Sequence, residues 1–203
     1  MISNITLVLA SESPRRKTLL EEAGFSFQVF PVKVSENLEK NLNVDDQIKA
    51  IARRKADRAF ESYKHLKSGD FLILTADTMV VLDGKHLGKP ADSTEARSML
   101  MQLSGKKHQV KTAVCLVEGR KKQDGIVKLL VDLETTDVFF KTLSEKEIQD
   151  YIATGEPMGK AGSYGIQGLG GKFVEKIVGS YDNVVGLPID LLKKMLKAGA
   201  WQI

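Results

Sequence analysis

Mostly apolar runs alternate along the chain with stretches of helical periodicity. The runs at 5–10 and 71–74 are short and bounded by polar residues, which is typical of buried strands. Between them, residues 45–63 place Ile48, Ile51 and Ala52 on one side of a predicted helix. This order of strand, helix and strand indicates an α/β protein.

Local sequence signals mark where further helices begin and end. Ser13 and Pro14 suit the N-cap and first position of a helix that stops near Gly24. Capping-box patterns precede two later helices, one starting near 93 and one ending near 155: Asp92 with Glu95, and Ser144 with Glu147. The last helix is expected to begin at Pro188 and to have an apolar face of Leu191, Leu192, Met195 and Leu196.

The remaining extended segments complete a sheet. Residues 25–31 alternate apolar and polar, 33–43 form a polar loop, and Asp83-Gly84 predicts a hairpin after 79–82. The runs 110–118 and 126–140 are expected to pair as antiparallel neighbours, and 172–178 is a further strand. We therefore expect a single mixed α/β domain over residues 1–203. Its twisted sheet would carry flanking helices and split into two lobes around a cleft.

Composition excludes several classes of protein. The 203 residues include 42% hydrophobic and 28% charged side chains with a net charge of +4, as in an ordinary globular protein. Arg120-Lys121-Lys122 indicates an exposed turn, and 6% aromatic content argues against nucleic-acid binding. Cys115 is the only cysteine and lies in an apolar run, so it is expected in the core. Neither a targeting segment nor a run of about 18 apolar residues is present, which excludes membrane insertion and favours the cytoplasm.

The segment Ser11-Glu12-Ser13-Pro14-Arg15-Arg16 is the strongest candidate for an anion site. It follows a predicted strand and begins a helix, where free backbone N–H groups attract phosphate. Two arginines in a first helical turn are unfavourable by roughly 0.3–1 kcal/mol each unless an anion offsets them. A solvated basic turn is the simpler alternative, but the combination favours phosphate binding.

Other candidate residues lie on separate loops. Asp77 stands between two apolar runs, where it either caps a strand end or faces a ligand at the edge of the sheet. Lys89 lies between Gly88 and Pro90, although a lysine in a turn is usually only solvated. The glycines of the segment 160–168 are expected to let a ligand approach the backbone closely, and its Gln167 amide suits a nucleobase edge; a glycine-rich hairpin without a ligand is the alternative. Glu36 is a candidate to hold a metal together with Asp77, whereas the three histidines have no metal-binding spacing.

Together these groups would neutralise a polyphosphate and leave carboxylates for a divalent cation. Five motifs occur in order: Ala10–Arg16, Ala76–Thr78, Gly88–Pro90, Lys160–Gly168 and Val184–Pro188. They resemble those of the Maf family of nucleoside triphosphate pyrophosphatases, over essentially the whole chain. The fold implied is that of Maf and inosine triphosphate pyrophosphatases, with a nucleotide in the cleft.

The resemblance implies cleavage between the α- and β-phosphates, a magnesium or manganese ion, and often a homodimer. By position, Asp77 corresponds to the general base and Glu36 to an acid that assists the metal, so both are expected to contact it. The family lines its phosphate site with residues that correspond to Ser13, Arg16, Lys55, Lys89 and Lys160. Lys55 lies on the apolar side of its helix, and its stem can be buried while the ammonium extends outward.

The resemblance also concerns the nucleotide. Arg15, Thr78 and Gln167 match the branch that acts on dTTP and UTP rather than the branch for 7-methyl-GTP, and modified pyrimidine triphosphates remain possible substrates. Two positions depart from the family pattern, which usually has acids where Ser35 and Gly159 stand. Two alternatives stay open: a purine-directed enzyme of the inosine triphosphate type, and a non-catalytic nucleotide sensor linked to cell division.

Overall fold

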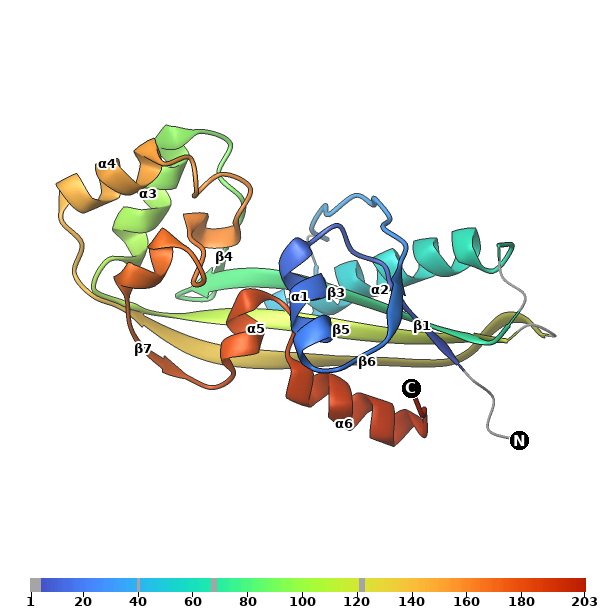
Figure 1. Cartoon of the computed structure of the whole chain (residues 1–203). Helices are drawn as coiled ribbons and strands as arrows, with labels where there is room; N and C mark the ends of the chain where they lie inside the picture. The colour runs from blue at the N-terminus through green and yellow to red at the C-terminus, as the bar shows by residue number, and fades with distance from the viewer. Residues whose placement is uncertain (1–4, 40, 67–68, 121–122) are drawn as a thin grey trace. The chain divides into compact units, whose positions relative to one another are not determined.

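The computed structural model describes residues 5–39, 41–66, 69–120 and 123–203 (Figure 1). Among these, seven strands form one sheet in the order β2-β1-β3-β5-β6-β7, with β4 paired to β3. The strands are β1 (Thr6–Leu9), β2 (Phe27–Val29), β3 (Phe71–Leu82), β4 (Lys85–Leu87), β5 (Lys107–Arg120), β6 (Gln123–Phe140) and β7 (Val174–Val178). The α-helices are α1 (Pro14–Glu22), α2 (Val44–Tyr63), α3 (Ser93–Leu103), α4 (Glu145–Ala153), α5 (Tyr181–Val185) and α6 (Ile189–Gly199). Of two short 3₁₀ turns, η1 (Ala161–Ser163) lies in the glycine-rich segment 160–168 and η2 (Leu169–Phe173) directly follows it. The mixed α/β fold predicted from the sequence is confirmed.

The first three strands are parallel and create a switch in strand order. β1 lies between β2 and β3, with Leu9 opposite Val29 on one side and Leu74 on the other. Figure 1 draws α1 in front of these strands and α2 behind them. Right-handed crossovers require this, because the connections β1–α1–β2 and β2–α2–β3 cross the sheet in opposite directions. In open α/β sheets, ligands bind beyond the carboxyl ends of the strands at such a switch. The segment that follows β1 therefore stands at a favourable place for a ligand.

One prediction about β3 is wrong. The runs 71–74 and 79–82 are halves of a single strand, so Asp77 lies inside β3 and not at a strand end. The neighbouring strand explains how the carboxylate is nevertheless available: β1 ends at Leu9, opposite Leu74, and β3 continues past it. Asp77 thus follows the last residue of β3 that pairs with β1.

The described chain divides into two compact units. Unit 1 comprises residues 1–77, 112–134 and 186–203, and unit 2 comprises 78–111 and 135–185. In unit 1 the buried side of α2, including Ile48, Ile51 and Ala52, belongs to the core. In unit 2 the core contains a cluster of rings from Phe140, Tyr151, Tyr164, Phe173 and His108.

Most predicted helix boundaries are confirmed. Ser144 and Glu147 form a complete capping box at α4. Asp92 caps α3 through the Glu95 N–H, but the Glu95 carboxylate accepts from Ala91, so that box is incomplete. α2 begins one residue early because the Asn43 side chain accepts the Asp46 N–H and serves as its N-cap. The apolar face of α6 is buried as expected.

Other segments differ in detail from the predictions. The hairpin at Asp83-Gly84 is confirmed, and both residues have positive φ (50° and 75°), as a two-residue turn requires. Phe140 N donates to Lys106 O, which joins the end of β6 to the start of β5, as in the predicted antiparallel pair. The strand predicted at 172–178 begins only at Val174, and the short helix α5 is not among the predicted elements.

Three further observations bear on composition. Cys115 is fully buried, as predicted. Lys121 and Lys122 of the expected basic turn, and Lys40 of the polar loop, lie outside the described residues. Within the described chain, none of the helices combines the length and the apolar character needed to cross a bilayer.

Candidate active site

The segment after β1 forms the predicted helix start. Ser13 is the N-cap of α1 with extended backbone angles, and Pro14 is the first helical residue. The Ser13 side chain makes no capping hydrogen bond, and the Ser13 N–H instead donates to Ser11 Oγ at 3.2 Å. The Ser13 side chain therefore does not cap the N-terminus of α1, which suits this helix start to an incoming anion.

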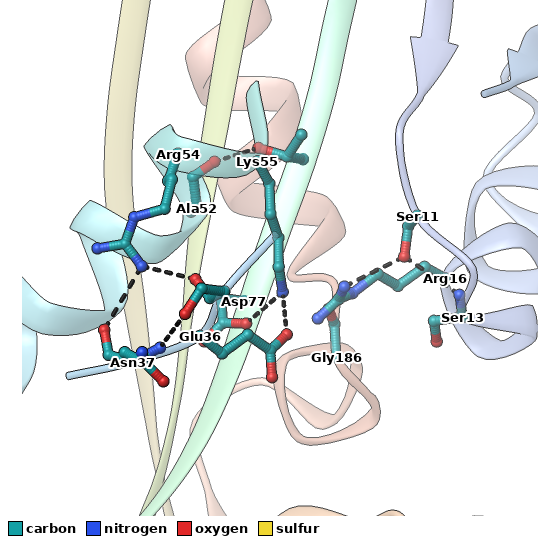
Figure 2. A network of polar contacts seen from close by, with 12 residues as sticks. Ser11, Ser13, Arg16, Glu36, Asn37, Ala52, Arg54, Lys55, Asp77 and Gly186 are labelled. Atoms are coloured by element: carbon teal, nitrogen blue, oxygen red, sulfur yellow. Dashed lines mark hydrogen bonds and ion pairs between the residues drawn. The ribbon is translucent and has the colours of Figure 1, made fainter. Parts of the chain in front are cut away.

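Arg16 is held in place from two directions (Figure 2). Its Nε donates to the Gly186 carbonyl at 2.7 Å, and its Nη1 donates to Ser11 Oγ at 3.2 Å. Burial lowers the pKa of this guanidinium, while the charges of Asp77 and Glu36 act against that shift. Arg16 is thus oriented by neutral groups within the field of two acids. Arg15, its neighbour in the first turn, is exposed.

Lys55 connects the two predicted acids. Its Nζ lies 2.6 Å from Asp77 Oδ1 and 2.7 Å from Glu36 Oε1. The side chains of Lys55 and Asp77 are only 14% and 11% exposed, so water screens their attraction weakly. The apolar stem of Lys55 lies among the buried positions of α2 and its ammonium reaches the acids, as expected from the resemblance.

Thr75 sets the position of Asp77 relative to α2. The Thr75 hydroxyl is fully buried and donates to the Ala52 carbonyl at 2.7 Å. Thr75 and Asp77 lie on the same face of β3, and Ala52 and Lys55 lie on the same face of α2. Because the hydrogen bond joins Thr75 to Ala52, it also brings Asp77 close to Lys55, and these two form the ion pair.

Arg54 fixes the loop that carries Glu36. Its Nη1 donates to the Ser35 carbonyl at 2.7 Å, and its Nη2 contacts Glu39 Oε1 at 3.1 Å. The adjacent residues Arg54 and Lys55 therefore both bind the loop. Arg54 binds the loop carbonyl of Ser35, and Lys55 binds the side chain of Glu36. Ser35, which departs from the family pattern, serves here through its carbonyl and through its hydroxyl, which accepts from Asn37 N at 3.3 Å.

A second group of predicted residues lies in unit 2. Gly162 N donates to the Gly88 carbonyl at 3.0 Å, which ties the loop of Lys89 to that of Lys160. Lys160 donates through Nζ to the Glu156 carbonyl. Gln167 and Lys89 are exposed, and Thr78 is half-buried in β3.

The predicted residues thus fall into two groups, one in each unit. Unit 1 contains Ser13, Arg15, Arg16, Glu36, Lys55 and Asp77. Unit 2 contains Thr78, Lys89, Lys160 and Gln167. The structure joins Glu36, Lys55 and Asp77 directly, and their roles in binding and catalysis stay predictions.

Sequence reasoning missed the supporting residues. Thr75, Arg54 and Gly186 each orient a predicted site residue, yet only Gly186 belongs to a motif recognised in the sequence. Gly186 lies 170 residues from Arg16, so periodicity or spacing cannot reveal their contact.

The histidines have no place in either group. His108 is buried in unit 2 and its Nε2 lies 2.8 Å from the Tyr164 hydroxyl. Among the described residues, no group of three or more His, Cys, Asp or Glu side chains is placed to hold a metal ion by itself.

Comparison with known proteins decides the family. Residues 6–199 match the family described as Maf-like protein. The chain belongs to the Maf family. A dTTP/UTP pyrophosphatase of Bdellovibrio bacteriovorus is 57% identical over 190 residues, covering 94% of this chain and 96% of that protein. Proteins of the same name from Desulfitobacterium hafniense and Caldicellulosiruptor bescii are 48% and 41% identical over 94% of this chain, covering 83% and 93% of their own lengths.

Among solved structures, a HAM1 protein from Coxiella burnetii has a similar fold. The TM-score is 0.51 at 11% sequence identity, over 97% of this chain and 98% of that one. This similarity supports the fold that the Maf resemblance implied.

The carboxylates can be tested against the divalent cation that the Maf resemblance implies. Glu36 and Asp77 converge on one cation in the structure, the Lys55 ammonium, within 2.7 Å. Magnesium is usually held by one or two carboxylates together with substrate phosphates, and not by an all-protein cage. The pair therefore fits an ion that is bound jointly with a nucleotide, and the lack of a third acidic ligand among the described residues is consistent with this.

Proposed function

We propose that this protein is a nucleoside triphosphate pyrophosphatase that hydrolyses dTTP and UTP to the monophosphate and pyrophosphate. The observation that carries the proposal is the convergence of Lys55, Asp77 and Glu36, together with Arg16 held by Ser11 and Gly186, beyond the carboxyl end of β1. The proposal is supported by the name shared by relatives up to 57% identical, which match over 94% of the chain.

The reaction needs a base and a means of neutralising charge. Water attacks a phosphorus of the α–β anhydride, the bond to the bridging oxygen breaks, and pyrophosphate leaves. Asp77 accepts the proton of the attacking water, since its carboxylate is fixed by Lys55 and is largely shielded from solvent. The Arg16 side chain and the backbone N–H groups at the start of α1 bind phosphate oxygens, with Ser13 at the helix start.

Glu36 and Asp77 would hold the divalent cation, magnesium or manganese. When bound, such an ion neutralises charge that develops on the phosphate oxygens. Lys55 is the counter-ion of the two acids without nucleotide, and its ammonium also lies within reach of a phosphate bound beside them. We assign phosphate binding to Lys89 and Lys160 as well, and selection of the base to Arg15, Thr78 and Gln167.

Two alternatives are less well supported. The purine-directed alternative rests on the likeness of the Maf fold to that of inosine triphosphate pyrophosphatases, and the similarity to the HAM1 protein, at 11% identity, concerns the fold alone. A non-catalytic sensor has no need for a carboxylate fixed as Asp77 is. We further propose a cytoplasmic location and a homodimer. Sedimentation equilibrium at several protein concentrations tests the homodimer directly.

A substrate panel tests the proposed function. Pyrophosphate release is measured from dTTP, UTP, CTP, GTP, ITP and methylated triphosphates, each with Mg²⁺, with Mn²⁺ and with chelator. We expect the highest kcat/KM on dTTP and UTP and no release with chelator. Faster turnover of GTP or ITP would favour the purine-directed alternative, and nucleotide binding without turnover would favour the sensor.

A further inference from the structure

Glu156 lies between α4 and η1, ahead of the glycine-rich loop (residues 160–171), and its carboxylate accepts three hydrogen bonds, two from that loop and one from Tyr151 of α4. Oε2 accepts the Leu169 N–H at 2.9 Å, and Oε1 accepts the Gly170 N–H at 3.2 Å. Oε1 also accepts the Tyr151 hydroxyl at 2.9 Å. Hydrogen bonds to an ionised carboxylate are about twice as strong as neutral ones. The carboxylate is thus an anchor for the loop.

Tyr151 extends this anchor to the start of the loop. Its ring is buried against Phe173, and its hydroxyl accepts the Gly165 N–H at 3.3 Å while donating to Glu156. Burial and the Glu156 charge raise the pKa of Tyr151, so the hydroxyl keeps its proton and remains a donor. Although burial acts to raise the pKa of Glu156, the Leu169 and Gly170 bonds outweigh it and hold that pKa below its usual value.

The glycines of the loop are explained by these contacts. A Cβ at Gly168 would lie 2.4 Å from Glu156 Oε1, and one at Gly170 would lie 2.7 Å from the Tyr151 hydroxyl. A larger residue at either position would force the anchoring group and the loop backbone apart. The sequence suggested that the glycines admit a ligand, but at Gly168 and Gly170 the nearest atoms belong to the protein's own anchors.

Gln167 lies within the segment that is held. Gly168 N donates to the Gly165 carbonyl at 3.2 Å and closes a turn around Gln167. Anchors lie two residues before it, at Gly165, and two residues after it, at Leu169. The Gln167 side chain is exposed, so its direction depends on the backbone that carries it. Lys160, which is predicted to bind phosphate, donates to the Glu156 carbonyl. Glu156 therefore contacts both the turn of Gln167 and a predicted phosphate-binding residue.

We propose that Glu156 is a positioning residue that fixes the turn of Gln167 and thereby controls discrimination between nucleobases. This inference rests on the proposed function, because it assumes that Gln167 reads the base of a nucleoside triphosphate. In this role Glu156 acts through the loop that it contacts. Its loss is therefore expected to affect choice between substrates more than the rate at saturation.

The Glu156→Gln substitution tests this role because it preserves size and replaces one acceptor oxygen with an NH₂ donor. That donor faces backbone N–H groups, so at least one anchoring bond is lost. We expect the ratio of kcat/KM for UTP over GTP to fall by about tenfold, the worth of one hydrogen bond to a charged group. Amide hydrogen exchange in residues 165–171 should accelerate. Asp150→Asn is the matched control, since Asp150 is an exposed acid of α4 in the same unit and pairs with Lys146.

Tyr151→Phe is the second variant and keeps the ring packing while removing the hydroxyl. It should shift the UTP-over-GTP ratio in the same direction and accelerate exchange at Gly165. If either folded variant has an unchanged ratio, or loses kcat/KM equally on every nucleotide, Glu156 serves only stability and the inference is overturned. A wild-type protein that releases no pyrophosphate from UTP or dTTP would instead overturn the proposed function, and with it the assignment of a base to Gln167.

Discussion

The Lys55 ammonium lies 2.6 Å from Asp77 Oδ1, and both side chains are almost buried. The same ammonium lies 2.7 Å from Glu36, so one lysine neutralises two acids. The three residues come from three separate segments of the chain. Breaking such a pair by removing one partner leaves a charge with poor solvation and is costly. The arrangement holds the proposed base in place before any nucleotide arrives.

Replacing Lys55 tests whether it competes with a metal. In Lys55→Met the stem is kept and the positive charge beside Asp77 and Glu36 is lost. A unit charge at this distance interacts by several kcal/mol even at moderate dielectric, so Mn²⁺ should bind at least about tenfold more tightly without nucleotide. Electron paramagnetic resonance of free Mn²⁺ measures this without turnover. Arg58→Met, an exposed cation on the same helix, should leave the affinity unchanged. Weaker Mn²⁺ binding by the Lys55 variant would contradict the account.

Substitutions of Arg16 and Arg15 should have different effects on the kinetics. Arg16→Lys loses the geometry that binds the Gly186 carbonyl and Ser11 Oγ together, so kcat/KM on UTP should fall about 10- to 100-fold. Arg15→Lys, at the exposed neighbouring position, should change the preference between nucleotides with a smaller loss on UTP. Steady-state kinetics on UTP, dTTP and GTP compare the two. Equal losses on all three substrates for both variants would show that the arginines act alike.

Acid should destabilise unit 2 through His108. Burial lowers the pKa of His108 to about 4, and Asp137 opposes this only partly. The unfolded chain binds this proton near pH 6.5 and the folded chain only near pH 4, so stability falls as the pH drops between these values. The full difference is about 3 kcal/mol. Urea unfolding from pH 4 to 8 measures it. His108→Asn should make the free energy of unfolding depend less on pH over this range, whereas the exposed control His65→Asn should leave this dependence unchanged. An unchanged slope in His108→Asn would assign the acid sensitivity to other groups.

The sequence predicts local features well because they depend on neighbouring residues. The start of α1 at Ser13-Pro14, the capping box at Ser144 and the Asp83-Gly84 hairpin are all confirmed. Each follows from backbone preferences within a few residues. The Maf family was recognised from five motifs in order, and the family match confirms it.

Long-range relationships could not be read in the same way. Asp77 was expected at a strand end, yet β3 is continuous and only the shorter neighbour β1 ends there. That outcome depends on pairing between distant segments. The sequence predicts that the loop glycines admit a ligand, but a Cβ at Gly168 would meet the carboxylate of Glu156, which belongs to none of the five motifs. Thr75, Arg54 and Gly186 act through tertiary contacts that no local pattern encodes.

The central claim is that Asp77 is the base of a nucleotide pyrophosphatase. Asp77→Asn keeps the size of the side chain but cannot accept the proton of water. Pyrophosphate release from UTP is compared at saturating nucleotide and Mg²⁺, with Asp57→Asn on the exposed side of α2 as the control. The account predicts a fall in kcat of at least about 10²-fold for Asp77→Asn and little change for the control. A folded Asp77→Asn protein with a near-normal kcat would contradict it.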